Sequence, residues 1–157
     1  MIVIKEITND LHKSEITERI LRKLPEWFGN EEALKNYIYT VKGKKFYAAY
    51  DDDLVVGFIC LKINNQYTAD IYLTGVLKDY HRKGIGRKLL IQSEEYLVDS
   101  GYKLFMVKTL GGSSDYEYYK KTRIFYKSMG FYPLEEFKEI WDEENPCLIM
   151  VKSLTYE

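Results

Sequence analysis

Two glycines between an apolar strand pattern and an amphipathic helix pattern constrain this chain more than any other feature. The strand pattern DIYLTGV ends at Val76, and after a short polar loop Gly84 and Gly86 open a helix whose apolar face carries Leu89 and Leu90. Glycine lets a ligand approach the backbone closely, and the first N–H groups of a helix have no partner within it. The positive end of the helix dipole adds to this. The pattern therefore predicts an anion site suited to a phosphate or pyrophosphate.

The loop around these glycines is basic, with His81, Arg82, Lys83, Arg87 and Lys88 inside eight residues. Two common nucleotide motifs do not fit it. The pattern GxxxxGK[ST] is absent, and GxGxxG is broken by Leu89 at the third glycine position. A dinucleotide fold would also place the loop after its first strand, whereas here it follows the fourth predicted strand. A different phosphate-bearing ligand is indicated.

The periodicities along the chain predict an α/β protein with a mixed sheet of about seven strands and about four helices. The expected order is β-α-α-β-β-β-α-β-α-β-β. Strands are expected at 2–7, 46–50, 54–62, 67–76, 103–110, 134–141 and 147–154. Helices are expected at 14–24, from the cap Asn30 to Val41, at 84–100 and at 118–129.

Composition narrows the class of protein further. The 157 residues carry 23 Lys+Arg against 24 Asp+Glu, and 46% are hydrophobic, which fits one folded domain over 1–157 and disfavours a wholly basic nucleic-acid binder. No apolar run approaches the ~20 residues of a membrane span, so a cytoplasmic protein is expected. Cys60 and Cys147 lie in apolar segments, so both are expected to be buried thiols. No metal site is expected, because His12 and His81 are not spaced as ligands.

The segment HRKGIG, residues 81–86, resembles the Q/RxxGxG/A signature of the GNAT superfamily of acetyl-CoA-dependent N-acetyltransferases, with His81 in the first position. The segment TRIFYKSMGF, residues 122–131, is similar to the second CoA-side motif of that family. The predicted element order is also that of the family. The resemblance implies a GNAT-like fold and an enzyme that moves an acetyl group from acetyl-CoA, its cosubstrate, directly to a primary amine.

The resemblance also assigns roles to particular residues. Tyr126 matches the tyrosine that donates a proton to the departing CoA thiolate, and Tyr119 stands where the family often has Asn. The pantetheine arm would be lined by Thr74, Gly75 and Val76. The pyrophosphate would be wrapped by Arg82, Lys83, Gly84, Ile85, Gly86 and Arg87, with Lys88 nearby.

The chemistry requires a neutral amine, and Asp70 is the leading candidate for the base that takes its proton. Some family members have Glu in this strand, and Asp is one methylene shorter, so a bridging water is an alternative. Strand alternation places Asp70, Tyr72, Thr74 and Val76 on one face. The opposing interpretation is a solvated carboxylate at a strand edge. For Tyr126, the opposing interpretation is a packing residue with a buried hydroxyl.

The acceptor is expected beside the segments LPEWFGNEE and EEFKEIWDEENP, where Trp27, Phe28 and Trp141 offer aromatic walls. Both segments are acidic, which favours a cationic acceptor: a polyamine-like or aminoglycoside-like molecule, a lysine or an N-terminal amine. A merely solvated acidic surface is the alternative. The carboxylates concerned are Glu26, Glu31, Glu32, Glu135, Glu136, Glu139, Asp142, Glu143 and Glu144.

Two other function classes compete with this enzyme. A non-catalytic acyl-CoA-binding regulatory or interaction domain would share the phosphate loop without needing Asp70 or Tyr126. A nucleic-acid-binding module would need a wider positive surface than one loop supplies, so no nucleic-acid partner is expected. Exposed sheet edges could pair two chains into a homodimer.

Overall fold

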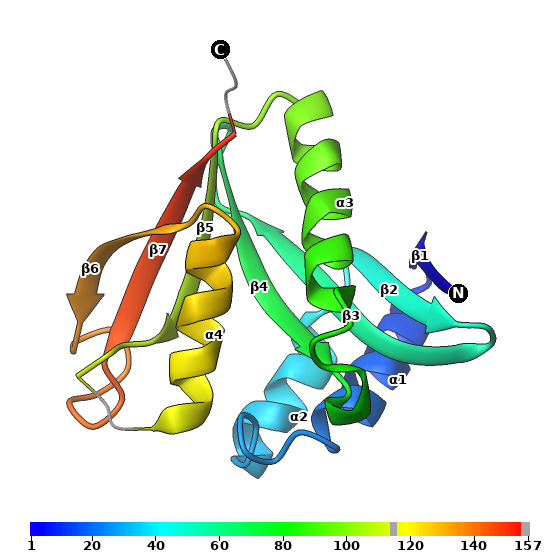
Figure 1. Ribbon diagram of the computed structural model, residues 1–157, viewed down its shortest axis with the longest axis horizontal. Coiled ribbons are helices and arrows are strands. Elements are labelled where there is room, and N and C mark those ends of the chain that lie inside the picture. The colour runs from blue at the N-terminus through cyan, green and yellow to red at the C-terminus, as the bar shows by residue number, and fades with distance from the viewer. Residues whose placement is uncertain (114–115, 155–157) are drawn as a thin grey trace. The chain divides into compact units, whose positions relative to one another are not determined.

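The computed structural model describes residues 1–113 and 116–154, and its strands form one mixed sheet (Figure 1). Seven strands lie in the order β1-β2-β3-β4-β5-β7-β6. The pair β4–β5 is parallel, whereas β1–β2, β2–β3, β5–β7 and β6–β7 are antiparallel. The predicted α/β class and element order are confirmed. The chain divides into two compact units, and β4 contributes residues to both.

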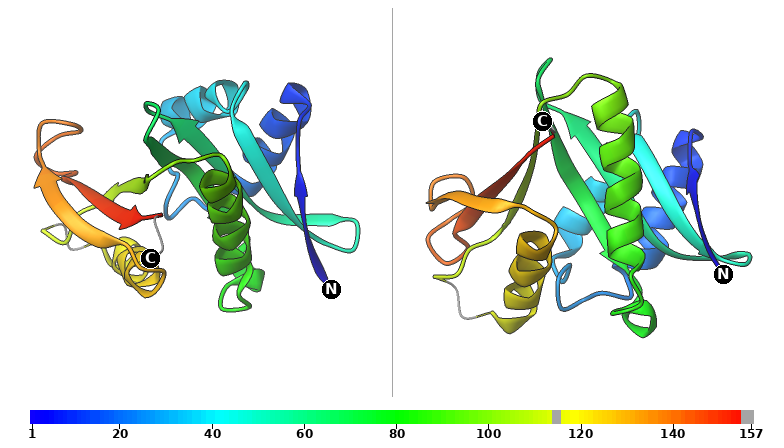
Figure 2. Two further views of the ribbon diagram at one scale, coloured as in Figure 1. Left: turned by 90° about the horizontal axis from the view of Figure 1, so that it is seen from above. Right: turned by 45° about the horizontal axis from the view of Figure 1, so that its top comes forward.

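The first unit comprises residues 1–62 and 72–97. Its elements are β1 (Ile2–Glu6), α1 (Asp10–Leu21), α2 (Glu31–Thr40), β2 (Lys45–Asp51), β3 (Leu54–Ile63), the end of β4 (Thr68–Val76), the short 3-10 helix η1 (Lys78–Tyr80) and α3 (Ile85–Asp99). Helices α1 and α2 cover one face of its strands and α3 covers the other (Figure 2). Fully buried Ile20, Leu21, Phe58 and Leu89 belong to its core.

The second unit comprises residues 63–71 and 98–157. Its elements are the start of β4, β5 (Leu104–Leu110), α4 (Glu117–Ser128), β6 (Tyr132–Phe137) and β7 (Cys147–Ser153). Helix α4 packs against β5, and the rings of Phe105 and Phe131 meet at 5.5 Å. Gly130 has φ +94, which lets the chain turn sharply after α4 and return Phe131 to the core.

Both cysteines are buried free thiols, as predicted. Burial raises the pKa of the Cys60 thiol to about 12, so it is a poor nucleophile at neutral pH. Within the described ranges no helix is long and apolar enough to span a bilayer. The same part of the chain holds no group of three His, Cys, Asp or Glu residues that could bind a metal ion.

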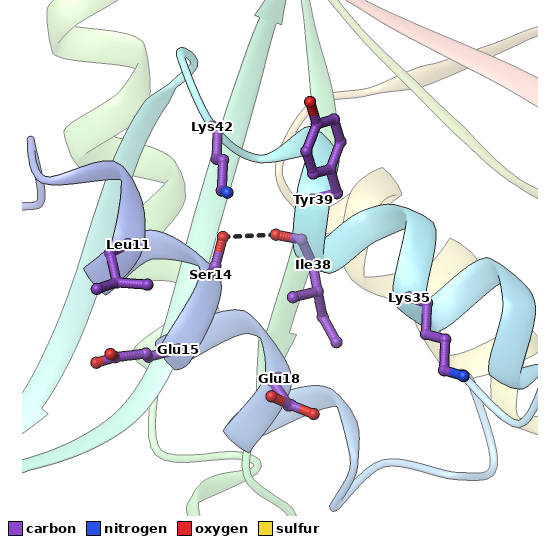
Figure 3. Close-up of a pocket in the computed structure, with 8 residues that line it drawn as sticks. All are labelled: Leu11, Ser14, Glu15, Glu18, Lys35, Ile38, Tyr39 and Lys42. Carbon is purple, nitrogen blue, oxygen red and sulfur yellow. Dashed lines mark hydrogen bonds between the residues drawn. The ribbon is translucent and has the colours of Figure 1, made fainter.

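A shallow pocket of about 300 Å³ lies between α1 and α2 (Figure 3). The hydroxyl of Ser14 in α1 donates a hydrogen bond to the carbonyl of Ile38 in α2 at 2.6 Å. The lining residues are Leu11, Ser14, Glu15, Glu18, Lys35, Ile38, Tyr39 and Lys42. None of the residues predicted to bind cofactor or acceptor lines this pocket.

Candidate active site

The basic loop before α3 has the backbone geometry of an anion cradle. Arg82 and Gly84 both adopt left-handed conformations, with φ +64 and +77. Turns of this kind direct successive N–H groups into one concavity. The N–H of Lys88 donates to the Gly84 carbonyl at 3.0 Å, so the helical ladder begins here. The N–H groups of Ile85 and Gly86, in the first turn, have no partner within the helix.

The backbone at Gly84 is open to an approaching ligand. A Cβ built on Gly84 would meet no atom within 4 Å. The side chains of Arg82, Lys83, Arg87 and Lys88 are exposed around it. The Lys83 ammonium lies over the Tyr80 ring at 5.0 Å. Open backbone and surrounding positive charge together suit the pyrophosphate of a nucleotide cofactor.

The end of β4 carries the three residues predicted to line the pantetheine arm. Gly75 packs against α1, because a Cβ there would lie 3.2 Å from the side chains of Ile20 and Leu24. Thr74 donates from its hydroxyl to the Phe58 carbonyl of β3 at 2.9 Å. This side-chain hydrogen bond joins β4 to the backbone of β3.

The contacts of Tyr72 and Val76 show which faces of β4 these two side chains occupy. The Tyr72 ring meets Tyr37 of α2 at 5.8 Å. The methyls of Val76 and Ile85, the first residue of α3, both lie against Gly57. Helices α2 and α3 cover opposite faces (Figure 2). The predicted alternation that placed Tyr72 and Val76 on one face therefore does not hold, because the strand is irregular near Thr74.

The loop between α1 and α2 meets the basic loop. The ring of Trp27 contacts the ring of His81 edge-on, with centroids 5.8 Å apart. Glu26 forms an ion pair with Lys78, and Glu31 pairs with Arg22 at 3.1 Å. Two carboxylates that were predicted to attract a cationic acceptor are thus already paired with cations of the chain itself.

An aromatic cluster beside this loop was missed by the sequence analysis. Phe28 contacts Tyr37 edge-on at 6.3 Å, and Tyr37 contacts Tyr72. The hydroxyls of Tyr72 and Thr40 share a hydrogen bond of 2.6 Å. Burial raises the pKa of Tyr37. Tyr37 lies in the helix that was predicted up to Val41, but neither this helix nor β4 carries a sequence pattern that pairs Tyr37 with Tyr72.

Tyr126 lies in α4 of the second unit, and only 4% of its surface is exposed. Its ring contacts Phe131 at 5.7 Å, and its carbonyl accepts the Phe131 N–H at 3.0 Å. Burial raises the pKa of Tyr126, and the charge of Asp70 and the nearby Tyr119 raise it further. The phenol therefore stays protonated at neutral pH.

Asp70 belongs to the same unit, on the part of β4 that pairs with β5 opposite Met106. It is 5% exposed, which excludes a solvated edge carboxylate. The negative charge of Asp70 contributes to raising the pKa of two other groups, the Tyr126 phenol and the Cys147 thiol. Trp141, also in this unit, lies between β6 and β7 and is 45% exposed.

Comparison with protein families decides what this arrangement belongs to. The family model described as an acetyltransferase (GNAT) domain matches residues 42–133, more than half of the chain. The chain belongs to the GNAT acetyltransferase family. The match spans the basic loop, α3 and α4, which are the elements that the two GNAT-like motifs occupy. No curated protein matches the chain by sequence.

Solved structures of GNAT proteins share the fold over nearly the whole chain. The ribosomal-protein-S18-alanine N-acetyltransferase from Escherichia coli is 15% identical, with a TM-score of 0.79 over 100% of this chain and 96% of its own. A GNAT acetyltransferase from Elizabethkingia anophelis, with acetyl-CoA bound, is 16% identical. Its TM-score is 0.73, and the match covers 97% of each chain. An aminoglycoside 6'-N-acetyltransferase complexed with coenzyme A is 17% identical. Its TM-score is 0.76, and the match covers 99% of this chain and 98% of its own.

Membership of the GNAT family supports an acyltransferase. The cofactor-bound neighbours and the cradle before α3 support acetyl-CoA as its cosubstrate. The sequence-predicted phosphate-binding residues gather in the first unit, and Tyr126 with Asp70 in the second.

Proposed function

We propose that this protein transfers the acetyl group of acetyl-CoA to a primary amine by direct attack. The observation that carries the proposal is the cradle at Arg82 and Gly84 in a chain of the GNAT family. In the reaction the amine nitrogen bonds to the acetyl carbon and the C–S bond breaks. The CoA thiolate leaves, and the new amide nitrogen loses a proton.

The first turn of α3 and its basic flank would hold the cosubstrate by its pyrophosphate. Backbone N–H groups of residues 84–87 would bind the phosphate oxygens, and the exposed ammonium and guanidinium groups of Lys83, Arg87 and Lys88 would add to the attraction. Thr74, Gly75 and Val76 would line the pantetheine arm. His81 does not weaken this assignment, because the phosphate contacts come from the backbone.

Tyr126 would stabilise the leaving thiolate as a hydrogen-bond donor. A CoA-like thiol has a pKa of about 8.5 and a free tyrosine about 10, and the pKa of Tyr126 is raised above that value. Complete proton transfer from Tyr126 to the thiolate is therefore uphill. A donated hydrogen bond needs no such transfer and is stronger in a desolvated site.

Asp70 would act on the amine proton. A free alkyl ammonium has a pKa of about 10.4, so it must be deprotonated before attack. Asp70, a carboxylate that is 5% exposed, would take this proton directly or through one water. The neighbours named for an aminoglycoside and for a ribosomal-protein alanine support an amine as acceptor.

The test is turnover of acetyl-CoA over a panel of an aminoglycoside, a polyamine and peptides with a free lysine or an N-terminal alanine. We expect at least one amine to be acetylated. Tyr126→Phe should lower kcat about a hundredfold and change the KM for acetyl-CoA little, because the lost hydrogen bond serves the departing thiolate. The control is Tyr132→Phe, which alters a tyrosine that is 74% exposed.

Two results would contradict the proposal. Tight binding of CoA without turnover of any amine would favour a non-catalytic acyl-CoA-binding domain. Equal turnover by the wild type and Tyr126→Phe would remove Tyr126 from the reaction and leave the cosubstrate assignment standing.

A further inference from the structure

The pyrophosphate loop contains a backbone conformation that its own sequence disfavours. Arg82 has φ +64, a left-handed conformation that is unfavourable for a residue with a side chain. Such a conformation persists only where neighbouring contacts hold it. The contacts on the segment just before Arg82 therefore determine the shape of the cradle.

One set of these contacts comes from the sheet. The Leu77 N–H donates to the Val56 carbonyl at 2.9 Å, and the Tyr80 hydroxyl donates to an Asp51 carboxylate oxygen at 2.7 Å. His81 lies 2.7 Å from the Val76 carbonyl through its Nε2, which must be the donor because a carbonyl only accepts. These bonds fix where the segment leaves β4.

A second set comes from the loop between α1 and α2. The Lys78 ammonium lies 2.5 Å from one carboxylate oxygen of Glu26 and 2.6 Å from the other. The Trp27 ring meets the His81 ring nearly perpendicularly, at 78°. Lys78 begins η1, and His81 directly precedes Arg82. Both ends of the short turn that leads into the cradle are thus held from outside the sheet.

The α1–α2 loop is itself a fixed anchor. The N–H groups of Trp27 and Phe28 both donate to the Leu24 carbonyl, at 3.1 and 3.0 Å. Leu24 is 3% exposed and packs against Gly75. The Glu26 side chain is 22% exposed, so its ion pair is partly desolvated. This anchoring lets Glu26 and Trp27 impose a position on the segment they touch.

We infer that Glu26 and Trp27 are positioning residues for the pyrophosphate loop, which they hold through Lys78 and His81. The inference rests on the proposed cosubstrate. It gives the α1–α2 loop, expected to border the acceptor, a second role in setting the affinity for the pyrophosphate of acetyl-CoA. Trp27 thereby acts on the cofactor loop, in addition to or in place of forming an acceptor wall.

The decisive variant is Glu26→Gln, because electrostatics and positioning predict opposite signs for it. Removing a carboxylate near the phosphate site should by electrostatics alone strengthen acetyl-CoA binding. Loss of positioning should instead raise the KM and Kd for acetyl-CoA about two- to fivefold, the range that corresponds to an exposed ion pair. The value of kcat at saturating acetyl-CoA should stay within about twofold.

A truncated cosubstrate separates positioning from general damage. S-acetylpantetheine carries the same thioester and pantetheine arm without the pyrophosphate, so its KM should not change in Glu26→Gln. Trp27→Leu tests the other contact without altering charge, and it should raise the Kd for CoA about two- to fivefold while leaving the Kd for pantetheine unchanged. Glu18→Gln is the control, since it removes another ion-paired carboxylate, 2.8 Å from Arg22, that does not touch the loop.

Three results would overturn the inference: tighter or unchanged acetyl-CoA binding in Glu26→Gln, an equal loss for S-acetylpantetheine, or the same loss in Glu18→Gln. Should Glu26→Gln fail to fold, the same outcomes are required of Trp27→Leu. Calorimetric Kd values for CoA and pantetheine give the same comparison without turnover. If no amine is acetylated, the proposed reaction fails, while these Kd values still decide the role of Glu26.

Discussion

At the scale of single residues, burial and the charge of a neighbouring carboxylate act together on Tyr126, one of the 15 tyrosines. Tyr126 is 4% exposed and lies within reach of the charge of Asp70. Both effects disfavour the phenolate and raise its pKa. The same desolvation that keeps the hydroxyl protonated for a departing thiolate also makes the folded state sensitive to alkali.

Tyr126→Phe should make the protein less sensitive to high pH. The pKa of Tyr126 is raised above its unfolded value of about 10, so its contribution to stability is present below that pH and is lost as the pH rises through the folded pKa. Above about pH 10 the free energy of unfolding should fall less steeply in the variant, by about 1.4 kcal/mol per pH unit. Urea unfolding followed by circular dichroism between pH 8 and 11 measures this.

Tyr132→Phe provides the control for this slope, because the Tyr132 side chain is 74% exposed. We expect its pH dependence to match that of the wild type. If Tyr126→Phe and the wild type lose stability in parallel above pH 10, Tyr126 is not desolvated in solution.

At the scale of elements, two asparagines decide where the first helices begin. The side chain of Asn9 accepts a hydrogen bond from the His12 N–H at 2.9 Å, and that of Asn30 accepts from Ala33 at 3.0 Å. The cap at Asn30 was predicted, and α2 begins there. The cap at Asn9 was not predicted. Because Asn9 caps the helix, α1 starts at Asp10, four residues before the predicted start at Ser14. A cap side chain satisfies N–H groups that an apolar stripe does not reveal.

Replacing Asn30 by alanine should destabilise the protein by about 1 kcal/mol, because the Ala33 N–H loses its acceptor. For a chain of this length the expected fall in Tm is about 2–4 °C. Thermal unfolding followed by circular dichroism measures the change. Asn36→Ala makes the same substitution at an exposed interior position of α2 and should leave Tm unchanged or slightly higher. An equal fall in both variants would argue against the cap.

At the scale of the whole molecule, cosubstrate binding is linked to global stability. A ligand that binds only the folded protein adds about 2.7 kcal/mol at a hundredfold excess over its Kd. We expect CoA to raise Tm accordingly. Gly84→Glu should abolish this protection, because a carboxylate in the open space before α3 would occupy and repel the pyrophosphate site.

Gly43→Glu is the matched control for this prediction. Gly43 has φ +76 and, like Gly84, open space where a Cβ would lie, but it stands in the turn before β2. The two variants should lose similar stability from backbone strain, and only Gly43→Glu should retain protection by CoA. Protection that persists in Gly84→Glu would refute the cradle.

The sequence by itself determined the class of fold and the element order, and it predicted an anion site before α3. These follow from features that are local in the chain: strand and helix periods, glycines at a strand–helix junction, and two motifs that resemble the GNAT family. Element ends were less well predicted. The strand expected over 134–141 runs instead over Tyr132–Phe137, because it starts directly after the Gly130 turn and pairs with β7 only as far as Phe137.

Only the tertiary structure decided which partners the site residues have. Glu26 forms an ion pair with Lys78, 52 residues away, and the Trp27 ring contacts the His81 ring. Asp70 is buried in the unit that contains Tyr126, and near Thr74 the irregular β4 separates the faces of Tyr72 and Val76. Desolvation and ion pairing depend on contacts between distant parts of the chain. A hydrophobic periodicity or a sequence motif gives information only about residues that are close together in the chain.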